Sequence, residues 1–526
     1  MGVTYFNSST PPRVVGNSYQ EATKRIRRKL RNYSLTSIIN VSLSILRENA
    51  GKRSIDEIQS APWITLLIAK LAIEDSSIHL TDGKLCSEQV FNELRHELWE
   101  VAPDPEKSQG DDSSWALRMI RALAYPQLLF QQKETLSFVR WPALIAQLDE
   151  AHPCRVQFIN TFGCDPDIFM EISFTAYAAV MKNSFLVDSN YFNHLKSIYG
   201  VVVDQFIQRF SKTYGELRNI LQEELQARKD LPGGIANIRP VSEINEFPWF
   251  SRYPFLRYPN GQLVIWHRLV FARGMEDAVH NSLALHGQSY TDNFSKIFES
   301  YVVSLIDSTK LPYISEQEIR QGLPNNPAVE VIIPSPSGNV MVEAKMSLFR
   351  DEILITDRES RLFSKLKRVK EAMVQGWRVG DLIRNGYSYT QPLTSAIDYL
   401  VIVTSRQLNI CSGEQLIRLL GPEVLTRFTD PRKYSVPSAR QLQRLPLNNI
   451  FIISIAEFEN LMGAIEDGLI NLQDFLKEAS ILSSDLRTST FTFDQMLGPK
   501  VKKWRRSKLI EDTTDRIMEN LKMAFT

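Results

Sequence analysis

Residues 328–346 read AVEVIIPSPSGNVMVEAKM, and this stretch decides the fold expected for the second half of the chain. Two apolar runs rich in valine and isoleucine flank a short segment of proline, serine and glycine. Such a pattern predicts two strands, because β-branched residues favour strands and proline and glycine favour turns. We therefore expect a hairpin of two antiparallel strands.

The register of this hairpin follows from the position of its turn. If residues 335–338 form the loop, counting outward along both strands places Glu330 directly opposite Glu343. Side chains in directly opposed positions have Cβ atoms about 4.5–5.5 Å apart on one face of the sheet. Alternation along the strand sends Lys345 to the same face as Glu343. Two carboxylates and one ammonium group are thus expected to share a small patch.

Opposed carboxylates destabilise a sheet, and apolar neighbours strengthen the repulsion. The arrangement becomes favourable when a divalent cation bridges them. Mg²⁺ takes one or two carboxylates and keeps several waters, one of which becomes a nucleophile able to attack phosphorus. Lys345 could orient that water or stabilise charge on the phosphate oxygens. The alternative interpretation is a solvated sheet face, where Glu-x-Lys is common.

The neighbouring segments predict an α/β arrangement around the hairpin. Apolar residues at helical spacing predict a helix over 293–305, with Glu299 off its apolar stripe. The runs 399–404 and 450–454 are continuously apolar, as in buried parallel strands, and a helical pattern follows each of them.

Glu330, Glu343-Ala-Lys345 and the helix at 293–302 resemble the core of the PD-(D/E)XK, or restriction-endonuclease-like, nuclease superfamily. The resemblance covers about residues 245–475. It implies a restriction-endonuclease-like core, with a mixed central sheet flanked by helices. The chain departs from the usual pattern in having Glu where Asp is commoner at position 330, with no proline immediately before it.

The resemblance also implies a role for each site residue. Glu330 and Glu343 would bind Mg²⁺ (or Mn²⁺), and Lys345 would assist the attacking water. Glu299 would support a second metal or orient the first. Gln375 would match the polar residue that many members carry on the following helix.

Two basic segments are candidates for contact with a phosphate backbone. The first lies on a predicted helix after the hairpin and contributes Lys365, Lys367 and Arg368. The second lies near the C-terminus, where an indole among cations could also stack on an unpaired base; it contributes Lys502, Lys503, Trp504, Arg505 and Arg506. Solvated helix faces or docking of a protein partner are the alternatives.

The remaining chain divides by composition. Residues 1–230 are expected to form a mainly α-helical region with a sensor or regulatory role. Within it, Trp115, Met119 and Leu123 predict the apolar face of a helix that ends at Pro126. Residues 231–289 form an aromatic, proline-rich connector, 290–480 the nuclease-like core and 481–526 a basic helical extension.

Composition excludes several classes of protein. The chain has 526 residues, with 61 Lys and Arg against 60 Asp and Glu, so it is not basic throughout. Its apolar share of 43% is too high for a disordered protein. No run reaches the ~20 uncharged apolar residues of a membrane span, and no secretory signal or phosphate-binding glycine loop is present. Four separated cysteines indicate reduced thiols in the cytoplasm.

These observations and the resemblance lead to one functional hypothesis. The chain is expected to be a cytoplasmic, metal-dependent endonuclease with DNA as its substrate and RNA, including tRNA, as the alternative. The resemblance to bacterial restriction and anti-phage defence nucleases implies a defence role. A phage-derived or host protein would then contact the helical region as a trigger, and no membrane is involved. The alternative is an inactive protein with a vestigial nuclease fold that binds nucleic acid or another protein.

Overall fold

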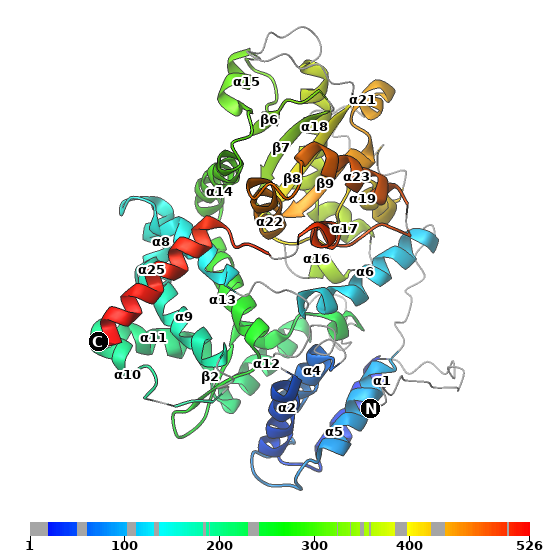
Figure 1. The fold of residues 1–526 in the computed structure, drawn as a ribbon. Coiled ribbons are helices and arrows are strands. Elements are labelled where there is room, and N and C mark those ends of the chain that lie inside the picture. Colours follow the sequence, from blue (N-terminus) through cyan, green and yellow to red (C-terminus); the bar gives the residue numbers. More distant parts are fainter. Residues whose placement is uncertain are drawn as a thin grey trace. The chain divides into compact units, whose positions relative to one another are not determined.

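The computed structural model describes residues 19–525 except for several gaps. The residues left out are 50–59, 102–111, 131–135, 182–185, 189, 230–240, 323, 337, 348–351, 357–358, 384–396, 422–424, 426–436, 486 and 502–503. The chain is mostly helical, with two small sheets (Figure 1). It divides into two compact units, one made of Met1–Lys107 and Lys212–Ile244 and the other of Ser108–Ser211 and Asn245–Thr526.

The first unit is a group of helices around one fully buried helix. Every residue of α4 is buried, and α4 packs against the other four helices of the group. Lys70 interrupts this apolar helix, and its ammonium is paired with Glu243 at 2.6 Å, while the hydroxyl of Tyr19 donates to the same carboxylate at 2.7 Å. The pairing satisfies a charge that would otherwise be costly to bury. The helices are α1 (Tyr19–Leu30), α2 (Leu35–Asn49), α4 (Pro62–Glu74), α5 (Glu88–Trp99) and α12 (Tyr214–Lys229).

The second unit contains a helical part and a small sheet that precede the predicted core. The sheet has the strand order β1-β4-β3-β2, with β1 and β3 antiparallel to β4. Its strands are β1 (Leu186–Val187), β2 (Ser211–Lys212), β3 (Phe255–Arg257) and β4 (Leu263–Ile265). The longer helices are α6 (Asp112–Phe130), α7 (Arg140–Ala146), α8 (Pro153–Phe162), α9 (Pro166–Met181), α10 (Asn193–Tyr199), α11 (Val201–Phe210) and α13 (Arg268–Leu283).

A five-stranded sheet forms the rest of the second unit's core, in the order β5-β6-β7-β8-β9. Strands β5 to β7 pair antiparallel, whereas β7, β8 and β9 pair parallel. Parallel neighbours need a crossover connection, and α18 supplies it between β7 and β8. The strands are β5 (Ile314–Ser315), β6 (Val331–Ile333), β7 (Asn339–Lys345), β8 (Asp398–Thr404) and β9 (Ile450–Ser454).

Helices α14, α18 and α22 contact this sheet directly, and α14 also packs against α22 (Figure 1). The helices around the sheet are α14 (Gln288–Ser308), α15 (Glu316–Gly322), α16 (Glu352–Ile355), α17 (Glu359–Lys365), α18 (Lys367–Leu382), α19 (Gly413–Leu420), α21 (Ala439–Arg444), α22 (Ile455–Glu466), α23 (Leu472–Ser484), α24 (Phe493–Leu497) and α25 (Lys508–Phe525). The last helix packs against α7 and α9. Strands β8 and β9 confirm the predicted strands at 399–404 and 450–454, and both are buried.

The compact units do not coincide with the boundaries expected from composition. Residues 108–211 do not group with the rest of 1–230, because charged side chains tie them to the C-terminal half. The guanidinium of Arg121 is fully buried and donates to the carbonyl oxygens of Leu408, Asn409 and Ile353. Of the expected connector at 231–289, residues 245–289 belong to the second unit, and they include α13, a helix with many buried residues.

Helix α6 also differs from its prediction. It continues through Pro126 to Phe130, because Leu129 and Phe130 beyond the proline are buried. Arg121 lies on its buried side, whereas the side chain of Leu123 is 42% exposed. Tertiary contacts thus override both the expected end and the expected apolar face of this helix. No helix in the described ranges has the length and apolar character to cross a membrane.

Candidate active site

The predicted hairpin is formed by β6 and β7, with the predicted register. Val331 pairs with Val342 and Ile333 with Val340, so extending the ladder by one residue places Glu330 opposite Glu343. Oε2 of Glu330 accepts a hydrogen bond from the backbone N–H of Ala344 at 3.1 Å. The first acidic side chain is therefore held against the Glu-Ala-Lys segment.

Lys345 lies next to the same carboxylates. Its ammonium donates to Oε1 of Glu343, two residues earlier on β7. The side chain of Glu343 is 1% exposed and that of Lys345 is 18% exposed. The Glu-x-Lys pattern is therefore buried, which argues against the interpretation of a solvated sheet face.

Glu330, Glu343 and Lys345 shift one another's pKa values, because little solvent screens their charges. Burial raises the pKa of Glu330 well above its usual range, and the negative charge of Glu343 raises it further. Burial also raises the pKa of Glu343. Hydrogen bonds with Glu330 and Lys345 lower this pKa but only partly offset the effect of burial. Burial alone would lower the pKa of the Lys345 ammonium, but the two carboxylates outweigh it and the pKa is raised. The site thus favours positive charge, as a proton or a cation, beside its carboxylates.

Glu299 faces the same charges from α14. Its pKa is raised by burial and by the charge of Glu330, while Lys345 acts in the opposite direction. Its carboxylate also interacts with the Lys345 ammonium and with Glu343. The structure therefore brings Glu299, Glu330, Glu343 and Lys345 together from α14 and the hairpin.

Gln375 lies at the edge of this group. Its amide nitrogen donates to the backbone carbonyl of Ala328, two residues before Glu330. This contact fixes the approach of the chain to β6. The side chain that we expected to take part in catalysis is thus bonded to the backbone beside the site.

The donor set fits a small oxygen-preferring cation. Oε2 of Glu343 is buried and has no hydrogen-bond partner within the described part of the chain. The facing carboxyl of Glu330 supplies a second oxygen ligand. Nowhere in the described ranges are three or more His, Cys, Asp or Glu side chains grouped to hold a metal ion. Two carboxylates with water completing the shell suit Mg²⁺ or Mn²⁺, and the absence of His and Cys disfavours Zn²⁺.

The first basic segment lies at the Lys345 end of the sheet. Gly376 lies against the side chain of Leu400 and Gly380 lies beside the carboxylate of Asp398, so α18 runs antiparallel to β8. Its first turn therefore lies near Thr404, the residue that pairs with Lys345. The basic side chains around this turn are exposed; they are Lys365, Lys367 and Arg368.

The second basic segment receives less support. Lys502 and Lys503 lie outside the described residues. Arg505 is paired with Asp467 at 3.0 Å and with Glu466 at 3.4 Å, so acidic neighbours neutralise its charge. Trp504 is half-buried, and Arg506 is exposed. The expected role of these residues in nucleic-acid contact remains a prediction.

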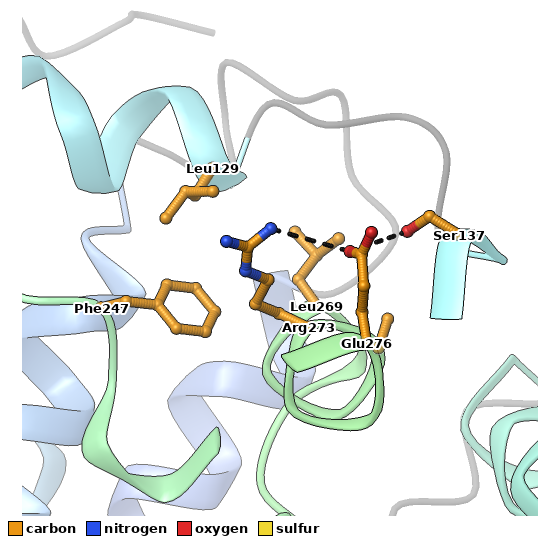
Figure 2. A pocket seen from close by; sticks show the side chains of 7 residues that line it. Leu129, Ser137, Phe247, Leu269, Arg273 and Glu276 are labelled. Atoms are coloured by element: carbon orange, nitrogen blue, oxygen red, sulfur yellow. Dashed lines mark hydrogen bonds and ion pairs between the residues drawn. The ribbon is translucent and has the colours of Figure 1, made fainter. Parts of the chain in front are cut away.

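A small cavity elsewhere in the second unit is too small to be a substrate site. Its volume is about 10 Å³, which is room for about one water. Figure 2 shows that Arg273 and Glu276 project side by side from α13 and form an ion pair, with the Ser137 hydroxyl donating to the same carboxylate. Leu129, Phe247 and Leu269 complete the wall.

Sequence reasoning did not find the buried ionic contacts behind α14. Arg140 forms a bidentate pair with Glu459 at 2.7 and 2.8 Å, and the hydroxyl of Tyr301 donates to the same carboxylate at 2.6 Å. Arg140 and Glu459 are 319 residues apart, so no local pattern could have indicated their contact.

Comparison of the chain with protein-family models, curated protein sequences and solved structures gives no match. The functional interpretation therefore rests on the geometry and chemistry of the site.

Proposed function

We propose that this protein is a metal-dependent nuclease that hydrolyses phosphodiester bonds. One observation carries the proposal: the half-buried Glu330 and the buried Glu343 face each other across a hairpin, with a lysine two residues beyond the second. Each of these groups would be costly to bury in a purely structural role. In a phosphodiesterase, the two glutamates would bind the metal ion and the lysine would assist the attacking water.

We also propose that the second unit contains a restriction-endonuclease-like core. A helix, an antiparallel strand pair, a crossover helix and further parallel strands follow one another from α14 to β9. This is the order that the PD-(D/E)XK resemblance implies. Support comes from the site residues, which lie on the elements where that resemblance expects them.

In the proposed reaction, Glu330 and Glu343 would hold Mg²⁺ or Mn²⁺ with their carboxylates. The bound ion would supply a water of lowered pKa and neutralise charge on the phosphate. The Lys345 ammonium would leave Glu343, orient the attacking water and donate to the phosphate oxygen on which charge develops. Glu299 would orient the water shell from α14.

The substrate follows from the same chemistry. The site would recognise phosphate, and the exposed cations at the start of α18 would hold the backbone on either side of the bond to be cut. We propose DNA as the substrate, with RNA as the alternative that the experiment below decides. A defence role in the cytoplasm, with a protein trigger acting on the helical region, is proposed from the resemblance, and four buried free cysteines agree with a reducing compartment.

The test is cleavage by the purified full chain. Plasmid DNA and total RNA are incubated separately with wild-type protein in Mg²⁺ or in EDTA. We expect cleavage only with Mg²⁺, and a loss of about 100-fold or more in Lys345→Met. Lys310→Met, which removes another lysine of the second unit, is the matched control.

Two results would contradict the proposal. Cleavage that persists in EDTA or in Lys345→Met would show a contaminating or different activity. Metal-independent binding without cleavage of either nucleic acid would favour the vestigial fold.

A further inference from the structure

Three arginines and three acidic residues form a buried ionic network next to the proposed site. Arg140, at the start of α7, is 1% exposed and pairs with Glu459 of α22 and Glu276 of α13, the latter at 2.9 Å. Arg273 contacts Asp277 at 3.0 Å and Glu276 at 3.7 Å. The three positive and three negative charges balance, so the network can remain buried without a net charge. Its sixth member is Arg406.

The network contacts two elements that carry proposed site residues. Arg406, which pairs with Asp277 at 2.9 Å, follows β8 two residues after Thr404, the ladder partner of Lys345. On the other side, the Tyr301 hydroxyl donates to Oε1 of Glu459 at 2.6 Å. Tyr301 lies on α14, two residues after Glu299.

The hydrogen bond from Tyr301 to Glu459 affects Glu299 because the two residues lie close together on α14. Residues two apart on a helix point about 200° apart, because each residue advances by about 100°. Helix α14 packs against β7, so Glu299 lies on the side of the hairpin charges while Tyr301 faces the network on the opposite side. A hydrogen bond at Tyr301 therefore limits the rotation of α14 about its own axis, and that rotation would move the Glu299 carboxylate.

We propose that the network positions Glu299 through the Tyr301 hydroxyl, so that helices α7 and α13 control the geometry of the site. Tyr301 and Arg140 are positioning residues in this proposal, since neither contacts the glutamates of the hairpin. The inference rests on the proposed nuclease function for its effect on catalysis. Its effect on the position of α14 does not depend on that function.

The variant Tyr301→Phe removes only the hydroxyl and leaves the Arg140–Glu459 pair in place. The matched control is Tyr313→Phe, just after the same helix, where the lost hydroxyl donates to Asp307 of α14 at 2.6 Å. Both changes remove one tyrosine hydroxyl that is hydrogen-bonded to an acidic side chain, but the bond of Tyr313 does not join α14 to α7 or α13.

The first readout needs no enzymatic activity. Spin labels on Lys296→Cys of α14 and Lys367→Cys of α18 report the distance between the two helices in the full chain. The four native cysteines are buried and do not compete for the label. We expect Tyr301→Phe to shift or broaden the distance distribution, whereas Tyr313→Phe leaves it as in wild type.

The second readout is single-turnover cleavage with Mg²⁺. A misplacement of about 1 Å can cost about 100-fold in rate, so we expect Tyr301→Phe to lower the single-turnover rate at saturating protein by about 10-fold or more. The protein concentration that gives half of this rate should be unchanged. Combined with Glu299→Gln, it should lower the rate no further than Glu299→Gln alone. A general loss of stability would not produce this non-additivity.

The outcomes separate the two proposals. A wild-type protein that cleaves nothing overturns the nuclease function, while the label distances still decide whether Tyr301 positions α14. Distances in Tyr301→Phe that match wild type overturn the positioning role, whatever the activity. Full additivity with Glu299→Gln overturns the part of the inference that concerns Glu299.

Discussion

The backbone N–H of Ala344 donates to Oε2 of Glu330 across the hairpin at 3.1 Å. Ala344 lies between Glu343 and Lys345, so this single bond holds the acid of one strand against the acid and the lysine of the next. If repulsion by Glu343 alone set its position, the Glu330 carboxylate would turn toward solvent. Here the backbone holds it beside the buried carboxylate of Glu343, which is the arrangement that a cation stabilises.

We expect Glu330→Gln to lower activity and raise stability. The amide keeps an acceptor for the Ala344 N–H but removes a charge whose pKa is raised by burial and by Glu343. Such a group destabilises the fold as pH rises above the pKa of the unfolded chain, because the folded state resists its ionisation. At pH 8 the free energy of unfolding should rise by about 1 kcal/mol, while cleavage falls about 100-fold or more.

Chemical denaturation and cleavage of the same preparations check this prediction. Glu318→Gln, on the exposed side of α15, is the control and should change cleavage little. A Glu330→Gln variant that is both inactive and less stable than wild type would show that the carboxylate has a structural role.

We expect the apparent affinity for Mg²⁺ to increase with pH. Burial raises the pKa of both hairpin glutamates, so at low pH the pair holds a proton that the cation must displace. Between pH 6 and 8.5 the Mg²⁺ concentration that gives half-maximal cleavage should fall by about 10-fold or more. A half-maximal concentration that stays constant over this range would exclude proton release from the site.

The cations at the end of α17 and the start of α18 should affect binding more than chemistry. Replacing Lys365, Lys367 and Arg368 by Gln should raise Kd for nucleic acid and reduce the slope of log K against log salt by up to about 3. The rate at saturating substrate should remain close to wild type. Fluorescence anisotropy at several salt concentrations measures Kd and the salt slope, and a cleavage assay measures the rate.

Arg505→Gln serves as the contrast in the same experiment. Its charge is already paired with Glu466 and Asp467, so its removal should leave the salt slope unchanged. A slope that falls as much as for one α18 cation would instead place the C-terminal segment on the nucleic acid.

His280 should make the second unit sensitive to acid. Burial lowers its pKa to about 3, and the nearby cations Arg406 and Arg140 act in the same direction, against Asp277. As pH falls below about 6.5, the pKa of a histidine in the unfolded chain, the imidazole binds a proton in the unfolded chain but not in the folded one. The free energy of unfolding should therefore decrease from about pH 6.5 downward.

The variant His280→Gln should reduce this pH slope between about pH 6.5 and 4. His286→Gln, at an exposed position six residues later, is the control. The slope is the informative quantity, because His280→Gln also alters the hydrogen bond to Tyr290. An unchanged slope would show that other groups cause the loss of stability in acid.

The hairpin shows how far local patterns reach. Its register could be predicted because alternation along a strand and a short loop fix which side chains oppose each other. Helix α6 shows the limit: its spacing predicted Leu123 on the buried face and an end at Pro126. The structure instead buries Arg121 and continues the helix to Phe130.

Local sequence is enough to predict the two facing glutamates, the lysine beside them and the buried parallel strands, because each depends on residues close together in the chain. The position of Glu299 near these groups and the contact of Arg140 with Glu459 on the far side of α14 depend instead on tertiary packing. A helix can rotate and pack in many ways that its own periodicity allows equally. Which of its faces meets a buried charge is fixed by partners hundreds of residues away, where burial makes each unpaired charge costly.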